Sequence, residues 1–262
     1  MHHPTAVIED GAELGSGVEV GPLSYIQAGV RVGDGCRIGP HVTLLTGTAL
    51  GADCRVHAGA VIGDLPQDAA FDEGAESFVR VGDRCILREG VTVHRGTKAG
   101  TATAIGDECF LMAFSHCAHN VELGERVIVA NGALLAGYVT VGPRAFISGN
   151  AVIHQFVHVG RLAMLGGGAA ASKDVLPFCT MRPAALNRVG GLNHVGMKRA
   201  GMKAGERAEA RRAFLRIARS DETPKAAAEA LLRESSEGPG AELARFVQAS
   251  TRGVCTMRDR GD

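Results

Sequence analysis

A six-residue repeat runs through most of this chain and restricts it to few folds. Every sixth residue from Ile8 is isoleucine, leucine or valine, and a glycine often follows directly. Helices repeat about every 3.6 residues and single strands every two, so neither produces this period. The repeat predicts one short strand per hexad, with three strands forming a triangular coil. The first run of inward-facing anchors is Ile8, Leu14, Val20, Ile26, Val32, Ile38, Leu44, Leu50, Val56 and Ile62.

The repeat resumes beyond an interruption, so the same coil is expected over residues 1–186. A polar and acidic segment, residues 64–80, separates the two runs, and a segment rich in Gly and Thr, residues 95–103, divides the second. Because the repeat continues after each segment, both are expected to protrude as loops, where function tends to concentrate. The second run is Val81, Leu87, Val93, Ile105, Leu111, Cys117, Leu123, Val129, Leu135, Val141, Ile147, Ile153, Val159, Leu165 and Ala171.

The last quarter of the chain has a different composition and predicts helices. The hexads end after Asp174, and Ala, Arg, Lys and Glu dominate from Met202. A helix is expected over residues 204–219, a second from the Thr223–Pro224 start signal to about Glu234, and a third over 241–250. We therefore predict a small α-helical domain over residues 187–262.

Composition narrows the class of partner. The chain has 28 basic and 28 acidic residues, so no net charge attracts it to nucleic acid. No apolar stretch is long enough for a membrane span, and the first residues do not form a secretory signal. The seven cysteines form no CxxC pair, which favours a reduced, cytoplasmic protein. Most of them fall at inward positions of the hexads and are expected in the core: Cys36, Cys54, Cys85, Cys109 and Cys117.

One column of residues has the composition of a reaction site. His119 stands two places past an anchor and should point outward. Three hexads further on is Gly137, and three more give Gln155, so the three residues should stack at the spacing of parallel strands, about 5 Å. His116 and His154 border the same region. The same counting puts His94 on another face, from which it could join the cluster only across a subunit boundary.

Several short motifs, in order along almost the whole chain, resemble the UDP-N-acetylglucosamine acyltransferases of lipid A synthesis. That family is built on a left-handed parallel β-helix and assembles as a homotrimer. The resemblance implies transfer of a (3-hydroxy)acyl group from acyl carrier protein to the sugar 3-position of UDP-N-acetylglucosamine, without a metal or cofactor. The matching segments are His3-Pro4-Thr5-Ala6, Val93-His94-Arg95-Gly96-Thr97, His116-Cys117-Ala118-His119, His154-Gln155-Phe156, Gly191-Leu192-Asn193, Met197-Lys198-Arg199 and Ser250-Thr251-Arg252-Gly253.

The resemblance also implies roles for individual residues. His119 matches the general base and the Gly137 N–H matches the donor that stabilises the oxyanion. Gly167 matches the position where a larger side chain shortens the acyl groove, so a longer acyl chain is expected. Substrate contacts are expected from Asp68, His94, His116, Tyr138, His154, Gln155, Asn193 and Arg199.

Three departures from the family pattern leave alternatives open. Asn120 stands where the family usually has Asp, Tyr138 where His is usual, and Ala70 where a loop Lys is usual. These differences allow a diverged paralogue with another nucleotide-sugar or acyl substrate, or a paralogue that only binds. A third alternative is a zinc hydrase of the γ-carbonic anhydrase type, because His94, His116 and His119 could imitate its three ligands.

Overall fold

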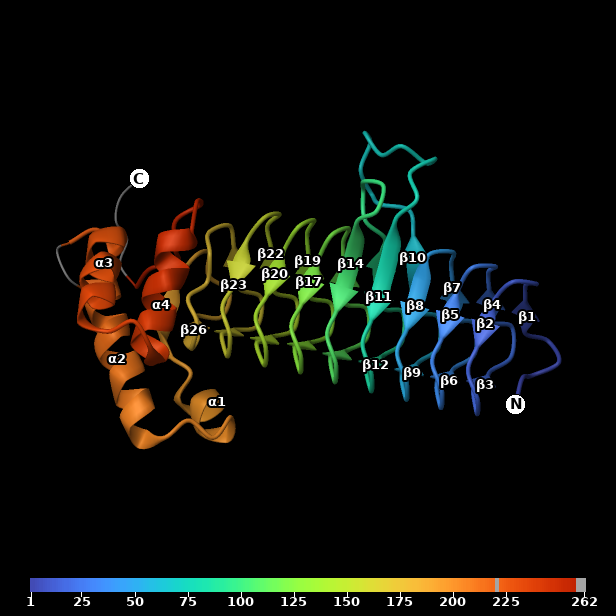
Figure 1. Ribbon diagram of the computed structural model, residues 1–262, viewed down its shortest axis with the longest axis horizontal. Coiled ribbons are helices and arrows are strands. Elements are labelled where there is room, and N and C mark those ends of the chain that lie inside the picture. Colours follow the sequence, from blue (N-terminus) through green and yellow to red (C-terminus); the bar gives the residue numbers. More distant parts are fainter. Residues whose placement is uncertain (220–221, 258–262) are drawn as a thin grey trace.

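The predicted anchors lie on short strands that wind into a left-handed parallel β-helix, seen from the side in Figure 1. The computed structural model describes residues 1–219 and 222–257. Strands three apart in sequence pair in parallel, as Ile8 does with Ile26. The predicted stacking of one coil on the next is therefore confirmed, and the anchors Ile26, Leu44 and Ile62 are completely buried.

Three sheets form the sides of the prism. Within the described residues the nine-stranded face contains β1 (Val7–Ile8), β4 (Tyr25–Ile26), β7 (Thr43–Leu44), β10 (Val61–Asp64), β13 (Thr92–His94), β16 (His116–Cys117), β19 (Leu134–Leu135), β22 (Val152–Ile153) and β25 (Ala170–Ala171). The eight-stranded face, counted over the same residues, contains β2 (Glu13–Leu14), β5 (Arg31–Val32), β8 (Thr48–Leu50), β11 (Phe78–Val81), β14 (Ala102–Ile105), β17 (Glu122–Leu123), β20 (Thr140–Val141) and β23 (His158–Val159).

The third side continues past the last coil. In the described part of the chain this ten-stranded face contains β3 (Glu19–Val20), β6 (Arg37–Ile38), β9 (Arg55–Val56), β12 (Ile86–Leu87), β15 (Phe110–Leu111), β18 (Ile128–Val129), β21 (Phe146–Ile147), β24 (Met164–Leu165), β26 (Cys179–Met181) and β27 (Val189–Leu192). β27 pairs antiparallel with β26, so the direction of the strands reverses where the hexads have ended.

The three edges of the prism are named by the residues that matter below. The histidine corner joins the nine-stranded face to the eight-stranded face and includes the turn at His119. The helix corner joins the eight-stranded to the ten-stranded face at Leu162, and the glycine corner joins the ten-stranded to the nine-stranded face at Gly167. Each position on a corner recurs one coil later, which is why residues far apart in sequence become neighbours.

The interrupting loops both leave from the histidine corner. One lies between β10 and β11 and the other between β13 and β14, and Figure 1 shows them projecting from the same edge. Beyond them the strands pair again in register, with Val81 opposite Ile105 and Val93 opposite Cys117. The prediction that both loops protrude without breaking the coil is confirmed.

The interior is narrow and consists of small and aliphatic side chains. The expected cysteines are buried as free thiols, and Cys179 and Cys255 are buried as well. Burial raises the pKa of the Cys117 thiol to about 12, so this group is neutral at physiological pH. The prediction that these cysteines pack in the core is confirmed for Cys36, Cys54, Cys85, Cys109 and Cys117.

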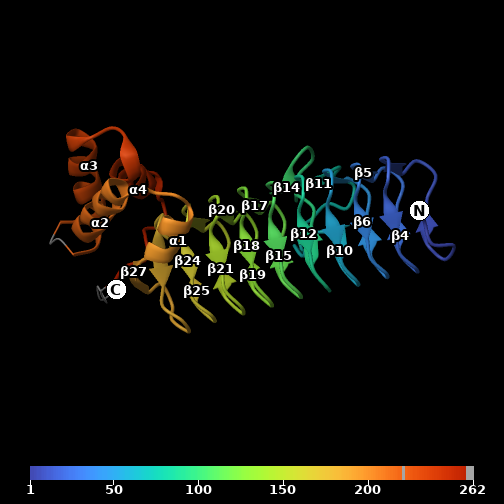
Figure 2. The same ribbon diagram turned by 90° about the horizontal axis from the view of Figure 1, so that it is seen from below.

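Four helices in the described residues follow the strands at the end of the prism opposite the N-terminus (Figures 1 and 2). α2 (Ala204–Arg219), α3 (Pro224–Glu234) and α4 (Gly238–Ala249) confirm the three predicted helices. The sequence analysis did not predict α1 (His194–Arg199), which is short and begins at the capping side chain of Asn193. None of the described helices is long and apolar enough to cross a membrane.

A buried carboxylate joins the prism to the chain that follows α4. Asp174 is 1% exposed, and its two oxygens accept hydrogen bonds from the His158 N–H at 2.8 Å and the Ser250 hydroxyl at 2.6 Å. The backbone of Asp174 also bonds to Gly253 and Cys255. The segment after α4 is thereby held against the last coil, close to the histidine corner.

Candidate active site

The His119 imidazole lies directly over Gly137 on the next coil. A Cβ placed on Gly137 would stand 2.5 Å from His119 Nε2 and closer still to Cε1, a separation that real side chains do not adopt. Gly137 has no positive φ, so its torsion angle alone would allow other residues. Its glycine is required by the ring above it, and the outward orientation predicted for His119 is confirmed.

Gly137 lines the pocket described below, and its N–H has no hydrogen-bond partner in the described structure. This N–H donates to no group among residues 1–219 and 222–257, whereas the N–H of the next residue, Tyr138, donates to the His119 carbonyl. A free backbone donor next to a proton acceptor can bind a developing negative charge.

Aromatic rings extend the column on the other side of His119. Tyr138 makes an edge-to-face contact with His119, with ring centroids 5.2 Å apart, and stacks on Phe156 of the next coil at 4.9 Å. Asn120, Tyr138 and Phe156 all have φ near +60°, which Asn adopts readily and aromatic residues rarely. Stacking of these rings offsets part of the conformational cost and limits the space available to His119.

His94 lies beside His116, and its predicted place on another face is wrong. The ring centroids of the two histidines are 4.9 Å apart in an edge-to-face arrangement. The loop between β13 and β14 adds a full hexad to its coil, so Val93 pairs with Cys117, not with a residue three hexads onward. A count that ignores this added hexad therefore assigns His94 to the face next to the one on which it lies. It belongs to the same chain's histidine cluster.

Burial keeps the two inner histidines neutral. Burial, together with the nearby His94 and His119 imidazoles, lowers the pKa of His116 to about 4. Burial also lowers the pKa of His94, against a smaller opposing effect of Asp64. His116 Nδ1 is 2.7 Å from the Thr92 hydroxyl, whereas His94 Nδ1 is buried without a partner in the described structure. Neutral imidazoles of this kind are hydrogen-bonding groups at physiological pH.

A pocket of about 400 Å³ opens in front of this cluster, on the outer side of the nine-stranded face. His116, His119, Gly137 and Gln155 line its polar side, and Leu134 and Val152, 46% and 41% exposed, form its apolar floor. The structure therefore brings the predicted base, oxyanion donor and amide together. This pocket combines polar groups at one edge with an apolar surface, as a site for an acyl chain and a polar acceptor requires.

The long loop contributes a residue that the sequence analysis missed. Gln67 lines the pocket, whereas the neighbouring Asp68 is exposed and accepts a hydrogen bond from the Ala70 N–H at 3.0 Å. No pattern distinguished Gln67, since loop residues have no hexad register from which to predict their direction.

The segment after α4 contributes a second missed residue. Arg252 reaches His154, with its guanidinium 3.3 Å from His154 Nδ1, and donates to the Ser172 carbonyl at 3.2 Å. The matching Ser250–Gly253 motif was noticed in the sequence, but its contact with the coil depends on the tertiary docking at Asp174.

Other predicted residues lie on different edges of the prism. Gly167 is exposed at the glycine corner, where an added Cβ would meet only the Gly149 carbonyl oxygen at 3.8 Å. Asn193 and Arg199 lie at the helix corner beside a pocket of about 680 Å³ whose apolar side includes Ile128 and Phe146. Within one chain, this pair does not meet His119.

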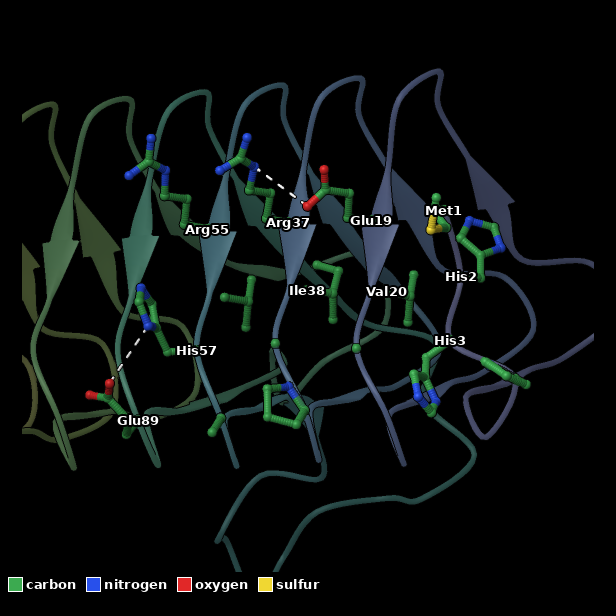
Figure 3. A pocket seen from close by; sticks show the side chains of 16 residues that line it. Met1, His2, His3, Glu19, Val20, Arg37, Ile38, Arg55, His57 and Glu89 are labelled. Carbon is green, nitrogen blue, oxygen red and sulfur yellow. Dashed lines mark ion pairs between the residues drawn. The ribbon is translucent and has the colours of Figure 1, made fainter.

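Another hollow, of about 870 Å³, lies on the ten-stranded face near the N-terminus and contains none of the predicted site residues. Figure 3 shows its charged side chains facing one another. Arg37 pairs with Glu19 at 3.7 Å and His57 with Glu89 at 3.6 Å. Because these side chains already contact one another, this hollow is a weaker candidate than the histidine corner.

Curated relatives cover nearly the whole chain. It is 38% identical to the acyl-[acyl-carrier-protein]–UDP-N-acetylglucosamine O-acyltransferase of Agrobacterium fabrum, over 99% of this chain and 96% of that protein. The enzyme of the same name from Alkalilimnicola ehrlichii is 43% identical, over 96% and 97% of the two chains. This chain belongs to the UDP-N-acetylglucosamine O-acyltransferase family. The predicted family membership and enzyme class are confirmed.

Family models and solved structures agree with this membership. The model of domain 2 of UDP N-acetylglucosamine O-acyltransferase matches residues 174–255, and bacterial hexapeptide-transferase repeats match 11–46 and 29–64. The UDP-N-acetylglucosamine acyltransferase from Campylobacter jejuni superposes with a TM-score of 0.92 at 34% identity, covering 98% of this chain and all of that one. The Francisella novicida enzyme gives 0.94 at 29% identity, covering 99% and 95%.

Membership of this O-acyltransferase family does not favour the zinc hydrase alternative. No group of three histidine, cysteine or acidic side chains in the described structure is arranged to hold a metal ion.

Proposed function

We propose that this chain transfers a (3-hydroxy)acyl group from acyl carrier protein to the 3-hydroxyl of UDP-N-acetylglucosamine, the first step of lipid A biosynthesis, with His119 as general base. The observation that carries the proposal is the placement of the His119 imidazole directly over Gly137, beside a free backbone N–H. The proton acceptor must contact the attacking hydroxyl while the oxyanion donor contacts the carbonyl oxygen, so the two groups must lie close together, as this pair does at the edge of the pocket.

His119 would take the proton of the sugar hydroxyl as its oxygen attacks the thioester carbonyl carbon. The carbon–oxygen bond forms, and the carbonyl oxygen becomes an oxyanion beside the Gly137 N–H. When the carbon–sulfur bond breaks, the imidazolium returns its proton to the leaving thiolate of the carrier. No metal or cofactor takes part in this sequence of steps.

The apolar floor would hold the acyl chain. Leu134 and Val152 lie between the histidine corner and the glycine corner and are unusually exposed for aliphatic residues. An acyl chain that begins at the thioester beside His119 can cross this face towards Gly167. Open space at Gly167 supports a groove long enough for a long chain.

The nucleotide sugar would contact polar groups on two edges. The histidine corner would provide His116, Gln155 and His154, with His94 behind them. Further contacts on this side would come from Tyr138, Asp68 and Arg252. Arg252 has no acidic partner in the described structure, and a guanidinium of this kind can bind a phosphate group. Asn193 and Arg199, at the helix corner, require a second chain to reach the same ligand.

A homotrimer would supply that second chain. The separation of Asn193 and Arg199 from His119 supports assembly around the flat sides of the prism, because three copies can bring the helix corner of one chain to the histidine corner of another. Sedimentation equilibrium should give three times the mass of the chain. A monomer that transfers acyl groups at full rate would refute the shared site.

The thiols support a cytoplasmic location. Seven buried free cysteines and no disulfide support a place in the reducing cytoplasm, where acyl carrier protein is also the expected donor.

His119→Ala tests the chemistry. Acyl carrier protein loaded with acyl chains of several lengths is incubated with UDP-N-acetylglucosamine, and the product is followed by mass spectrometry. The variant should lose about 10²–10⁴-fold in kcat, the usual contribution of a general base. His158→Ala, which removes an exposed imidazole on the eight-stranded face, is the matched control. Equal rates for His119→Ala and the control would refute the proposed role.

A further inference from the structure

Thr97, in the loop between β13 and β14, contacts the residue beside the proposed base through two donors. Its backbone N–H and its hydroxyl are each 3.0 Å from Asn120 Oδ1. The same oxygen is 3.2 Å from His119 Nδ1. A single carboxamide oxygen thus lies between a protruding loop and the imidazole.

The Thr97 N–H fixes the orientation of the Asn120 carboxamide. A backbone N–H can only donate, so the Asn120 atom that faces it must be the oxygen. Rotating the carboxamide by half a turn would place its NH₂ group against the Thr97 N–H, two donors facing each other, and would lose this hydrogen bond. The assignment of oxygen and nitrogen, which for most amides rests on weak preferences, is here determined by an obligatory donor.

The orientation of Asn120 then determines which nitrogen of His119 has the proton. Because Asn120 Oδ1 accepts only, His119 Nδ1 must donate to it, and in the neutral ring Nε2 must then be unprotonated. Of the two ring nitrogens, Nε2 is the nearer to Gly137, since a Cβ placed there would stand 2.5 Å from Nε2 and 2.9 Å from Nδ1. We propose that Thr97 is a positioning residue, which acts through Asn120 to present His119 to the substrate in its Nε2-basic tautomer; this inference rests on the proposed function.

Tyr138 completes the chain of donors. The Thr97 hydroxyl has one proton, which it gives to Asn120, so the Tyr138 hydroxyl 2.7 Å away must donate to Thr97. The Tyr138 hydroxyl thus donates to Thr97, and the Thr97 hydroxyl donates to Asn120 Oδ1. The same oxygen accepts the hydrogen bond from His119 Nδ1–H. Stacking on Phe156 holds the Tyr138 ring in place.

Every member of this chain of hydrogen bonds is uncharged. The relay therefore orients the ring without supplying a negative charge to stabilise the imidazolium. The other titratable groups around His119 are Tyr138 itself and the neutral imidazoles of His94 and His116, with Asp64 behind His94. Orientation and charge, which a carboxylate at position 120 would supply together, are separated in this protein.

The tautomer can be observed without any assay of activity. The full chain is labelled with nitrogen-15 at its histidines, and long-range proton–nitrogen correlation NMR distinguishes protonated from unprotonated ring nitrogens. The signal of His119 is the one that is missing from the spectrum of His119→Gln. The wild-type protein should show Nδ1 protonated and Nε2 free above neutral pH. Asn120→Leu should lose this preference. An Nε2–H tautomer in the wild-type protein would overturn the inference whatever the activity.

Kinetics then separate orientation from charge. Thr97→Val keeps the backbone donor and removes the hydroxyl, so kcat should fall about fivefold, the value of one hydrogen bond, with KM unchanged. Thr97→Ser should restore the rate. Asn120→Asp should shift the acidic limb of kcat/KM upward by about one pH unit or more, because a carboxylate stabilises the imidazolium.

The possible failures have different meanings. If Thr97→Val and Tyr138→Phe leave kcat unchanged while His119→Ala abolishes it, the relay is refuted and the proposed function is retained. If His119→Ala retains full activity, the proposed function fails, even where NMR shows the predicted tautomer.

Discussion

At the scale of single residues, the most constrained position is Gly137, whose missing side chain is the space that the His119 ring occupies. The constraint comes from a neighbour on another coil and not from its own backbone torsion. The constraint can therefore be tested with Gly137→Ala, which adds one carbon atom at this position.

Gly137→Ala should leave the fold intact and displace the His119 ring. A shift of about 1 Å in a catalytic group can lower the rate about 10²-fold, and we expect a loss of kcat of that order. Acyl-transfer rates and circular dichroism of the purified variant measure the two effects. Gly205→Ala, at a position with no neighbour within 4 Å, is the matched control and should retain the wild-type rate.

Burial of His116 makes the folded chain sensitive to acid. Its pKa is about 4 when folded and should be near the ordinary value of about 6.5 when unfolded. Between these values the unfolded state binds more protons, so the free energy of unfolding falls as the pH falls through this window. In urea titrations, the free energy of unfolding of His116→Asn should therefore fall less between neutral pH and about pH 4.5 than that of the wild-type protein. His158→Asn should behave like the wild type; an unchanged loss in His116→Asn would contradict the assignment.

Residue placement could be predicted from the sequence wherever the hexads were unbroken. His119, Gly137 and Gln155 were correctly put in one column, because each stands three hexads from the next. His94 was misplaced because the extra hexad before β14 interrupts the anchors but keeps them in phase, so counting by sixes does not show that a loop has replaced one strand. Gln67 and Arg252 had no register at all, since a loop and a docked tail determine their positions.

At the scale of elements, the strands follow from the repeat and the helices from their boundary signals. α2, α3 and α4 begin and end within a few residues of the predicted positions. α1 is too short to show an apolar periodicity, and its start depends on Asn193, whose side chain caps the Gly196 N–H at 2.8 Å and also reaches the Leu162 carbonyl. Local sequence could not reveal the second contact.

The start of α3 depends on one hydroxyl. Thr223 Oγ1 accepts a hydrogen bond from the Ala226 N–H at 3.2 Å, and Pro224 occupies the first helical position. Thr223→Ala should lower the free energy of unfolding by about 1 kcal/mol, the usual value of such a cap. Thermal unfolding followed by circular dichroism measures the change. Thr223→Ser keeps the hydroxyl and should be close to the wild type; a loss as large as that of Ala would contradict the capping role.

At the scale of the whole molecule, the predicted site residues are distributed over all three corners of the prism. The base and the oxyanion donor share one corner, Gly167 lies on a second, and Asn193 with Arg199 lies on the third. The hexads predicted the prism but not this distribution, because the position of a corner residue depends on how many residues the loops add.

Gly167→Met tests whether the acyl chain crosses the nine-stranded face. Position 167 has ordinary φ and open space around it, so the larger side chain should be accommodated without strain and should close the far end of the groove. The preference of the enzyme should move to acyl chains shorter by several carbon atoms, measured by competition between acyl carrier proteins loaded with different chains. An unchanged preference would mean that the chain takes another path.

Stacking of each coil on the next determines the order in which the coils unfold. Contacts run almost entirely between adjacent coils, so the prism is close to one-dimensional, and unfolding in such molecules begins at the ends and advances coil by coil. In the described structure the turns with Asn120, Tyr138 and Phe156 follow β16, β19 and β22, so five strands of the nine-stranded face precede this group and one, β25, follows it. Unfolding from the N-terminal end therefore has to pass several coils before it reaches the proposed reaction site, whereas at the other end the last coil and the docked helices protect that site.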